Sequence, residues 1–272
     1  MKKLLLLVAA VAALVGCKSD KETPATKSLI LYYSQTGATK AVAEALQEAT
    51  GADLELIEAV KPYDGDYDAT IKRCQEERSS GTEVEIKALK ANVADYDTVY
   101  IGYPVWFGTY APPVGTLLKT VNLEGKVVIP FCTFGSGGLT NTVASMRETL
   151  TKSTVFEGFG IRNARIGKLG QELPQYLINI GVKPGTPVVL PEFSEQKDVT
   201  EAEKAIFDAA CGDYPMPLGT PVSAASRKLE GGTEYLFTAV SEGGKGPGGE
   251  LRIHVVVSDS AAVKPEFTLV ER

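Results

Sequence analysis

The feature that most limits the fold is a series of short, largely apolar segments that recur between helical patterns. Three of these segments carry no charged residue: Leu29–Tyr33, Val99–Tyr103 and Val127–Phe131. Strands of this kind are buried on both faces, as in parallel sheets that helices cover on each side. Leu54–Ile57 and Val155–Ile161 complete the series. The sequence therefore predicts an α/β domain with a doubly wound, five-stranded parallel sheet.

Helical patterns separate these strands and set the limits of the domain. They cover residues 38–50, 71–77, 139–150 and 171–180. With the strands, they place the first domain at residues 28–182. The prolines that follow, at positions 184, 187 and 191, indicate an extended linker over residues 183–198.

Residues 199–272 show a different pattern. Thr200 and Glu203 match a capping box at the start of a short helix that we expect to end at Cys211. The strand-like segments beyond it are Val222–Leu229, Glu234–Val240, Glu250–Val257 and Glu266–Val270. The glycine-rich stretch Glu242–Gly249 predicts a hairpin loop. We therefore expect a second, small α+β domain in which one helix accompanies an antiparallel sheet.

The first residues predict an export signal. Two lysines precede an apolar run, Leu4–Val15, which is too short for an ordinary membrane span. The run leads to Cys17 in a pattern that resembles the lipobox of bacterial lipoproteins. This resemblance implies a signal peptide at residues 1–16 and a lipid on Cys17, with residues 17–27 as a flexible tether. An ordinary secretory signal with an incidental cysteine is the alternative. We expect an exported protein that is lipid-anchored to the bacterial cell envelope, in a leaflet that the pattern does not specify.

Charge and composition disfavour several function classes. The formal net charge of −6 disfavours a nucleic-acid partner. His254 is the only histidine, which argues against a histidine-based triad and a multi-histidine metal site. The other cysteines, Cys74, Cys132 and Cys211, show no metal-ligand spacing. We expect no catalytic residue and no metal, and we interpret Cys132 as a core residue and His254 as an ordinary sheet residue.

Three loops rich in glycine or hydroxyl residues follow predicted strands: Ser34–Thr39, Pro104–Gly108 and Thr133–Gly138. In an open parallel sheet, ligands bind outside the carboxyl ends of the strands. The first loop leads into a helix whose N-terminal N–H groups and partial positive charge suit a phosphate. Both the Walker pattern and the three-glycine dinucleotide fingerprint are absent from the sequence.

The motif Ser34-Gln35-Thr36-Gly37-Ala38-Thr39 resembles the Ser/Thr-x-Thr-Gly-x-Thr phosphate loop of flavodoxins. The second loop resembles the Pro-x-Trp segment of flavodoxin-like families, and the third looks like the loop beside the flavin edge. The resemblance spans the first domain and implies the strand order 2-1-3-4-5 and FMN as cofactor. It implies these cofactor-binding residues: Ser34, Gln35, Thr36, Gly37, Ala38, Thr39, Pro104, Val105, Trp106, Phe107, Gly108, Thr133, Phe134, Gly135, Ser136 and Gly137.

The same resemblance gives individual residues an expected role. Trp106 is the only tryptophan of the chain and is expected against the flavin ring, with a core position as the alternative. Gly108 is expected to be the peptide beside flavin N5 that reorients on one-electron reduction, because a glycine adopts a positive φ at little cost. The acidic residues within Asp64–Glu77 are candidates for keeping the redox potential low.

Residues 199–272 resemble a cystatin-like domain, in which one helix packs on a curled antiparallel sheet. The resemblance rests on the segment from Arg227 to Phe237, where a glycine turn precedes an aromatic strand. Lys228 and Glu230 place charge where an inhibitory cystatin needs an apolar wedge. We therefore expect a structural or partner-binding domain rather than a protease inhibitor.

The sequence leaves three functions open. The favoured function is electron transfer at the cell envelope by an FMN protein, with an unidentified redox partner. The second is an FMN-dependent reductase of quinones or other small acceptors, which requires a substrate pocket over the flavin. The third is a binding or scaffold lipoprotein that has lost FMN. The sequence does not decide whether the protein is an enzyme, although it favours an electron carrier.

Overall fold

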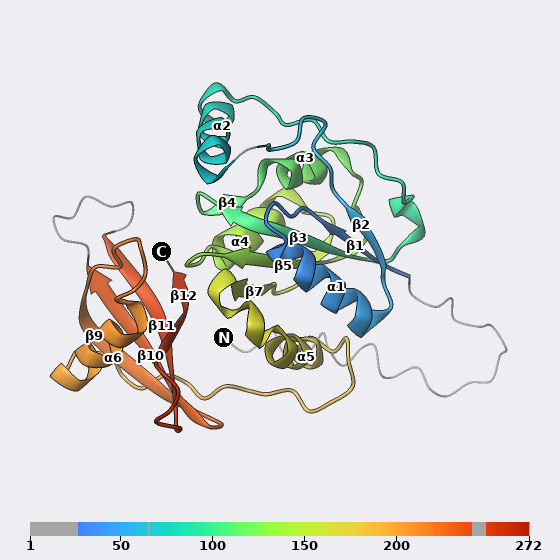
Figure 1. Cartoon of the computed structure of the whole chain (residues 1–272). Helices are drawn as coiled ribbons and strands as arrows, with labels where there is room; N and C mark the ends of the chain where they lie inside the picture. Colours follow the sequence, from blue (N-terminus) through green and yellow to red (C-terminus); the bar gives the residue numbers. More distant parts are fainter. Residues whose placement is uncertain (1–26, 65, 241–248, 272) are drawn as a thin grey trace, which may run out of the picture.

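The computed structural model describes residues 27–64, 66–240 and 249–271. Three predicted features lie outside the described residues. They are the signal peptide, the tether from Cys17 to residue 26, and nearly all of the hairpin loop Glu242–Gly249. Figure 1 shows a larger domain built on a parallel sheet and a smaller antiparallel domain beside it, joined by an extended segment.

The elements of the first domain follow the predicted alternation. Its strands are β1 Ser28–Tyr32, β2 Asp53–Leu56, β3 Thr98–Trp106, β4 Thr109–Tyr110, β5 Val127–Phe134, β6 Thr154–Val155 and β7 Phe159–Arg162. Its helices are α1 Ala38–Thr50, α2 Tyr67–Ser80, α3 Pro112–Thr120, α4 Leu139–Thr149 and α5 Leu169–Asn179. Short 3-10 turns cover Val93–Asp95 and Asn163–Lys168.

The sheet has the order β2-β1-β3-β5-β6, and β7 pairs with β5 further along the same edge. All of these pairings are parallel. The predicted fifth strand is thus split into β6 and β7, and the order 2-1-3-4-5 is confirmed. Only β4 runs against its neighbour, as a short hairpin on the end of β3.

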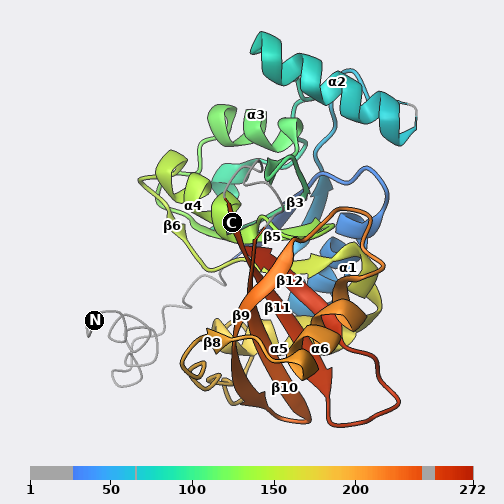
Figure 2. The same cartoon turned by 90° about the vertical axis from the view of Figure 1, so that its left-hand side faces the viewer.

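Helices cover both faces of the sheet (Figures 1 and 2). An apolar layer lies between the sheet and the helices on each face. On one face, Leu117 of α3 and Met146 of α4 pack with the side chains of Leu29 and Ile101. The other layer includes residues of α1 and α5, such as Leu46 and Leu177. Cys132, predicted to be a core residue, is fully buried.

Helix α3 is absent from our prediction. Its sequence begins with Pro112 and Pro113 and contains Gly115, three residues that usually interrupt helices. The prolines occupy the first two helical positions, where no intrahelical N–H bond is lost. Buried Val114 and Leu117 then hold the helix on the sheet. Packing of these two residues overrides the weak propensity of the segment.

The C-terminal domain has an antiparallel sheet in the order β12-β11-β10-β9-β8, with helix α6 against it (Figure 2). The elements are β8 Lys197–Asp198, α6 Glu201–Cys211, β9 Thr220–Leu229, β10 Gly232–Val240, β11 Glu250–Ser258 and β12 Glu266–Glu271. The capping box of Thr200 and Glu203 is present as predicted. Strand β8 lies within the predicted linker, so the described sheet has five strands rather than the four expected.

His254 is more than an ordinary sheet residue. Its Nδ1 lies 2.8 Å from Oε1 of Glu234, whose other oxygen accepts a hydrogen bond from Nε of Arg227 at 2.7 Å. Glu234 is only 7% exposed. Burial acts most strongly to raise its pKa, but the hydrogen bonds from His254 and Arg227 outweigh burial and hold that pKa below 4.5. These three side chains form a buried ionic network across β9, β10 and β11.

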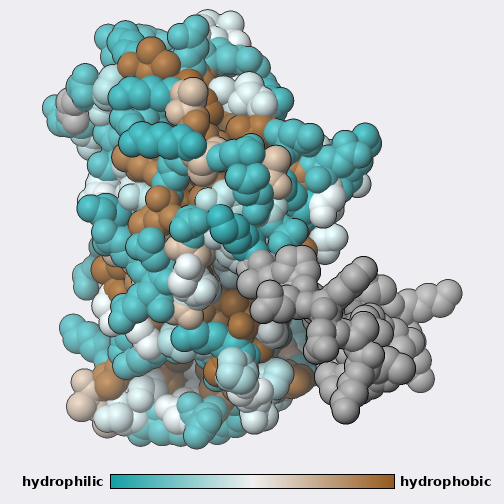
Figure 3. Space-filling model, turned by 90° about the vertical axis from the view of Figure 1, so that its right-hand side faces the viewer, coloured by the Kyte–Doolittle hydropathy of each residue, from teal (hydrophilic) through white to brown (hydrophobic). Residues whose placement is uncertain are grey.

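Among the described residues, no helix is both long enough and apolar enough to cross a membrane. On the face in Figure 3, hydrophobic side chains form scattered patches between hydrophilic ones. This mixture is usual for a protein surface in contact with water. Within the same residues, no group of three or more His, Cys, Asp or Glu side chains is arranged to hold a metal ion.

Candidate functional site

The first predicted loop connects β1 to α1 and leaves helix N–H groups open. Gly37 is the N-cap of α1, with φ of 92°, and as a glycine it has no side chain to cap the helix. Oγ of Ser34 accepts hydrogen bonds from the N–H groups of Gly37 and Lys40, both at 3.2 Å. The N–H groups of Ala38 and Thr39 belong to the first turn, where a helix supplies no acceptor. A Cβ built on Gly37 meets no atom within 4 Å, so the space above the loop is open.

The side chains of this loop divide into two groups. The buried Oγ1 of Thr39 lies 2.9 Å from Oγ1 of Thr133, which ties the first loop to the third. The amide of Gln35 donates to the carbonyl of Tyr63 at 2.6 Å and accepts from the Tyr33 hydroxyl at 2.8 Å. Only Thr36 keeps an exposed hydroxyl. The backbone and Thr36 thus face outward, whereas Gln35 and Thr39 shape the loop from within.

The second loop is a tight hairpin between β3 and β4. Trp106 pairs with Thr109, so Phe107 and Gly108 form a two-residue turn. Their φ angles, 51° and 77°, are both positive, as in a type I′ turn. Gly108 has a positive φ in this structure, and its reorientation on reduction stays a prediction. Phe107 is the only described residue other than glycine with a positive φ, which is a strained state typical of ligand sites.

Trp106 forms the centre of an aromatic cluster at this edge. Its ring lies edge-to-face against Tyr33, with 5.8 Å between the ring centroids, and against Tyr63, at 5.1 Å. Trp106 itself is half-buried. Burial raises the pKa of Tyr33 to about 12, although the nearby Arg73 opposes this shift. The cluster braces the first loop against the second, and Tyr63 is a member that our sequence analysis did not identify.

The third loop contacts both the second loop and the C-terminal domain. A Cβ on Gly138 would lie 2.6 Å from Cγ1 of Val105, and one on Gly137 would lie 1.9 Å from the carbonyl oxygen of Val270. A Cβ on Gly135 would lie 3.2 Å from the Tyr214 hydroxyl. The resemblance implies that Gly135 and Gly137 contact the flavin. In the structure, the lack of a side chain at these glycines allows the loop to pack closely against Tyr214 and Val270.

A buried joint fastens β12 to this loop. The Val270 N–H donates to the carbonyl of Ser136 at 2.8 Å. Arg162 is 8% exposed and donates to the carbonyls of Gly135 and Phe267, both at 2.8 Å. Its guanidinium also lies 3.2 Å from the centroid of the Phe267 ring. Burial lowers the pKa of Arg162. Nothing in the local sequence around Arg162 signals this role.

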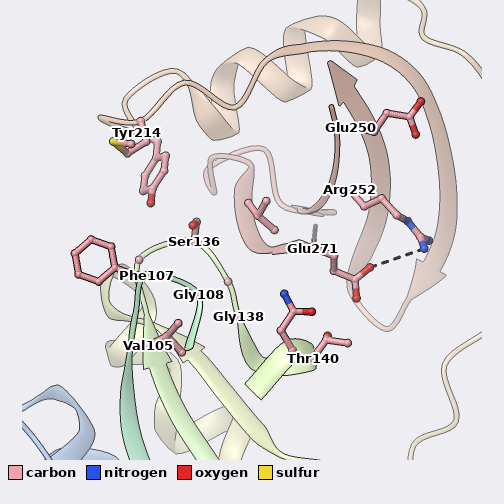
Figure 4. Close-up of a pocket in the computed structure, with 15 residues that line it drawn as sticks. Val105, Phe107, Gly108, Ser136, Gly138, Thr140, Tyr214, Glu250, Arg252 and Glu271 are labelled. Atoms are coloured by element: carbon pink, nitrogen blue, oxygen red, sulfur yellow. Dashed lines mark ion pairs between the residues drawn. The ribbon is translucent and has the colours of Figure 1, made fainter. Parts of the chain in front are cut away.

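Between the two domains lies a pocket of about 720 Å³, shown in Figure 4. Its size is within the range typical of small-molecule sites. The lining residues are Val105, Phe107, Gly108, Gly135, Ser136, Gly137, Gly138, Thr140, Asn141, Tyr214, Met216, Glu250, Arg252, Val270 and Glu271. Residues predicted for the second and third loops thus share one pocket. The Ser34–Thr39 loop is not part of its lining, and the Thr39–Thr133 contact joins this loop to the third loop, whose glycines line the pocket.

The structure therefore brings the three predicted loops to one edge of the sheet. This edge is the carboxyl end of β1, β3 and β5, where the winding of the sheet reverses between β1 and β3. An open α/β sheet binds its ligand at such a switch point. The contributions of Tyr214, Met216, Glu250, Arg252 and Glu271 come from the second domain, and our sequence analysis missed all of them.

Part of this chain is similar to solved structures. A candidate flavoprotein from Bacteroides eggerthii DSM 20697 is 30% identical, with a TM-score of 0.50, and the match covers 58% of this chain and 100% of that chain. A similar protein from Bacteroides uniformis ATCC 8492 is 27% identical over 55% and 98% of the two chains, with a TM-score of 0.49. A flavoprotein from Lactobacillus acidophilus NCFM, solved in complex with FMN, is 28% identical over 54% and 100%, with a TM-score of 0.45.

The family comparison covers the first domain almost completely. The model of the flavodoxin family matches residues 27–176, which is more than half of the chain. The match stops before the linker, so the C-terminal domain is an addition to the matched region. The strand order, the three loops and this match together show that the chain belongs to the flavodoxin family.

Proposed function

We propose that the protein binds one FMN at the carboxyl edge of its parallel sheet and acts in electron transfer. The observation that carries the proposal is the convergence of the three loops beside a helix N-terminus whose N-cap residue, Gly37, leaves the N–H groups of Ala38 and Thr39 available to a ligand. Membership of the flavodoxin family supports FMN as the cofactor. When bound, FMN supplies the capacity to accept and release one or two electrons.

The residues at this edge fit such a cofactor. The N–H groups of Ala38 and Thr39, with the exposed hydroxyl of Thr36, provide donors for a phosphate. The open space above Gly37 allows the phosphate to approach the backbone. Val105 and Phe107 offer apolar surface for a flat ring in the adjoining pocket. The strained turn at Phe107 is a further sign of a ligand site.

The visible absorption spectrum of the purified full-length protein tests this proposal. We expect two flavin bands in the near-ultraviolet and blue regions, either on purification or after FMN is added and the excess removed. A protein that stays colourless after this treatment would favour the third function considered above, a fold that has lost its cofactor.

One observation favours a second candidate function, the reduction of a small acceptor. An electron carrier that meets a protein partner needs an accessible flavin edge, whereas here the C-terminal domain faces the pocket (Figure 4). The volume of about 720 Å³ leaves space for a small molecule. Oxidation of the reduced protein by a small quinone, at a rate that saturates with quinone concentration, would support this candidate.

The protein is also proposed to act at the cell envelope, as a lipoprotein anchored through Cys17. The support is the sequence pattern alone, in which a short apolar run leads to a cysteine and a polar stretch. Cys17→Ser should leave the signal peptide uncleaved or release the protein from the membrane fraction. Mass spectrometry of the mature chain provides the test, because a start downstream of Cys17 without a lipid would contradict the anchor.

The resemblance of the C-terminal domain to cystatins remains part of the proposal. One helix on an antiparallel sheet supports the resemblance at the level of architecture. Lys228 at the end of β9 and Glu230 in the β9–β10 turn are both exposed, where an inhibitory cystatin needs an apolar wedge, so we propose no protease inhibition.

A further inference from the structure

We propose that the C-terminal domain forms the second wall of the chamber that receives the flavin ring, and that the Arg252–Glu271 pair adjusts the charge in this chamber. The inference rests on the proposed binding of FMN and adds residues that lie outside the region matched to the flavodoxin family. It gives the C-terminal domain a role in the redox site itself.

The C-terminal domain is held firmly against the third loop of the first domain. Strand β12 is bonded to the third loop through Val270 and Ser136. Arg162 bridges the same loop and the carbonyl of Phe267 from a buried position. Arg165 adds an ion pair with Glu266 next to this joint. Contacts made by buried backbone groups and a buried guanidinium fix a geometry better than exposed ion pairs do.

The pocket divides into two sides. Figure 4 shows Phe107, Val105 and Tyr214 on one side, and Arg252, Glu271 and Thr140 on the other. This division matches a flat ring system, whose apolar faces suit the first side and whose polar edge suits the second. Both domains contribute to each side, so the chamber is incomplete without the C-terminal domain.

The polar side of the chamber carries charge. Nη1 of Arg252 lies 3.9 Å from Oε2 of Glu271, which is an ion pair but too long for a hydrogen bond. The guanidinium and the carboxylate therefore lie side by side on the polar side of the chamber. Reduction adds negative charge to a flavin, so a nearby cation favours the reduced form and a nearby anion the oxidised form. Removing either partner should shift the redox equilibrium, and the two shifts should have opposite signs.

The test compares two variants of the full-length protein, Arg252→Gln and Glu271→Gln, each loaded with FMN. The measurement is the ratio of reduced to oxidised protein at equilibrium with a reference dye, read from the flavin spectrum. We expect Arg252→Gln to lower this ratio about fivefold and Glu271→Gln to raise it about fivefold. Thermal unfolding followed by circular dichroism confirms that each variant is folded.

Matched controls carry the same charge changes outside the chamber. Lys228 is exposed and pairs with Asp259, and Glu230 lies in the β9–β10 turn. Neither residue lines the pocket. Lys228→Gln and Glu230→Gln should each change the ratio by less than about twofold, because neither side chain lines the chamber and the effect of a charge outside it is screened by salt.

The outcomes separate this inference from the proposed function. Opposite shifts in the two chamber variants, with small shifts in the controls, support the second wall. If FMN binds but the chamber variants behave like the controls, or shift in the same direction, the inference is wrong and the proposed function stands. If FMN does not bind to the parent protein, both are wrong.

Discussion

Thr36 and Thr39 have the same side chain and lie three residues apart, yet the structure gives them different tasks. Thr36 is exposed at the mouth of the first loop, whereas Thr39 is buried against Thr133. The sequence motif alone predicted equivalent hydroxyl donors to a phosphate. Their burial distinguishes the two residues. The hydroxyl of Thr39 forms an internal hydrogen bond that holds the loop in shape, whereas Thr36 is exposed to a ligand.

The first prediction follows from this difference. Thr36→Ala changes an exposed side chain that has no hydrogen-bond partner among the described residues, so it tests phosphate binding more cleanly than a change at Thr39, which contacts Thr133. Loss of a hydrogen bond to a charged group costs about 1.5–3 kcal/mol, or roughly 10- to 150-fold in affinity. FMN affinity should fall by this factor in a fluorescence titration, and riboflavin affinity should change little.

The exposed Thr151 lies in the loop between α4 and β6, and Thr151→Ala is the control for this titration. The control should bind FMN like the parent protein. An equal loss of affinity for FMN and riboflavin in Thr36→Ala would place the phosphate elsewhere.

Glu234 provides a second prediction at this scale. Its pKa is held below 4.5, so its ionised form contributes stability at pH values above 4.5, and this contribution is lost as the pH falls through the lowered folded-state value. Glu234→Gln should reduce stability at pH 7 by about 3 kcal/mol, because Arg227 loses its buried partner. It should also flatten the loss of stability below pH 4.5. Urea unfolding at several pH values measures both effects.

The exposed turn residue Glu230 offers a matched change for comparison. Glu230→Gln should keep the full loss of stability in acid. Parallel curves of stability against pH for the parent protein and Glu234→Gln would show that the ionisation of Glu234 contributes nothing to the loss of stability in acid, which would contradict the prediction.

At the scale of elements, the parallel sheet could be predicted because each strand carries its own apolar signal. The order of the strands followed from the resemblance of the loops, and the helix of the C-terminal domain from its capping box. Helix α3 could not be predicted, since two prolines and a glycine obscure a helix that tertiary packing stabilises. Local sequence does not report contacts made across the sheet.

The third loop shows the same limit in the site. Its position at the strand end could be predicted from the pattern alone. The partners of Gly135 and Gly137 could not, because Tyr214 and Val270 lie in another domain far along the chain. Arg162 likewise gave no signal, since its acceptors are backbone carbonyls that the fold brings to it.

Gly137 gives a prediction for the joint between the third loop and β12. In Gly137→Ala, the new Cβ would lie 1.9 Å from the carbonyl oxygen of Val270, which is backbone and has to move. Overpacking of this kind costs about 1–3 kcal/mol. The variant should weaken the contact between the third loop and β12, so limited trypsin digestion should cut the linker after Lys183 or Lys197 faster than in the parent protein.

Gly167→Ala is the matched control, because a Cβ there meets no atom within 4 Å and Gly167 has no positive φ. Its digestion should follow that of the parent. Identical digestion of Gly137→Ala and Gly167→Ala would mean that the joint tolerates the extra methyl group and does not depend on close approach at this position.

At the scale of the whole molecule, the chain joins a flavodoxin domain to a second domain that reaches the ligand edge of the first. The joint between β12 and the third loop lies at the carboxyl edge of the parallel sheet, and the shared pocket lies at the same edge. An appended domain with only a structural task has no need to line this pocket. The architecture instead suits a protein in which the second domain controls what reaches the redox site, while a lipid anchor on Cys17 is proposed to hold both at the membrane.

The central claim is that this edge of the sheet holds FMN through a phosphate site and a ring chamber. Calorimetric titration of the flavin-free, full-length protein with FMN and then with riboflavin tests both parts directly. We predict one FMN per chain, bound at least about tenfold more tightly than riboflavin, since the phosphate adds at least one charge-assisted hydrogen bond. The absence of heat with either ligand, or equal affinity for both, would contradict the account.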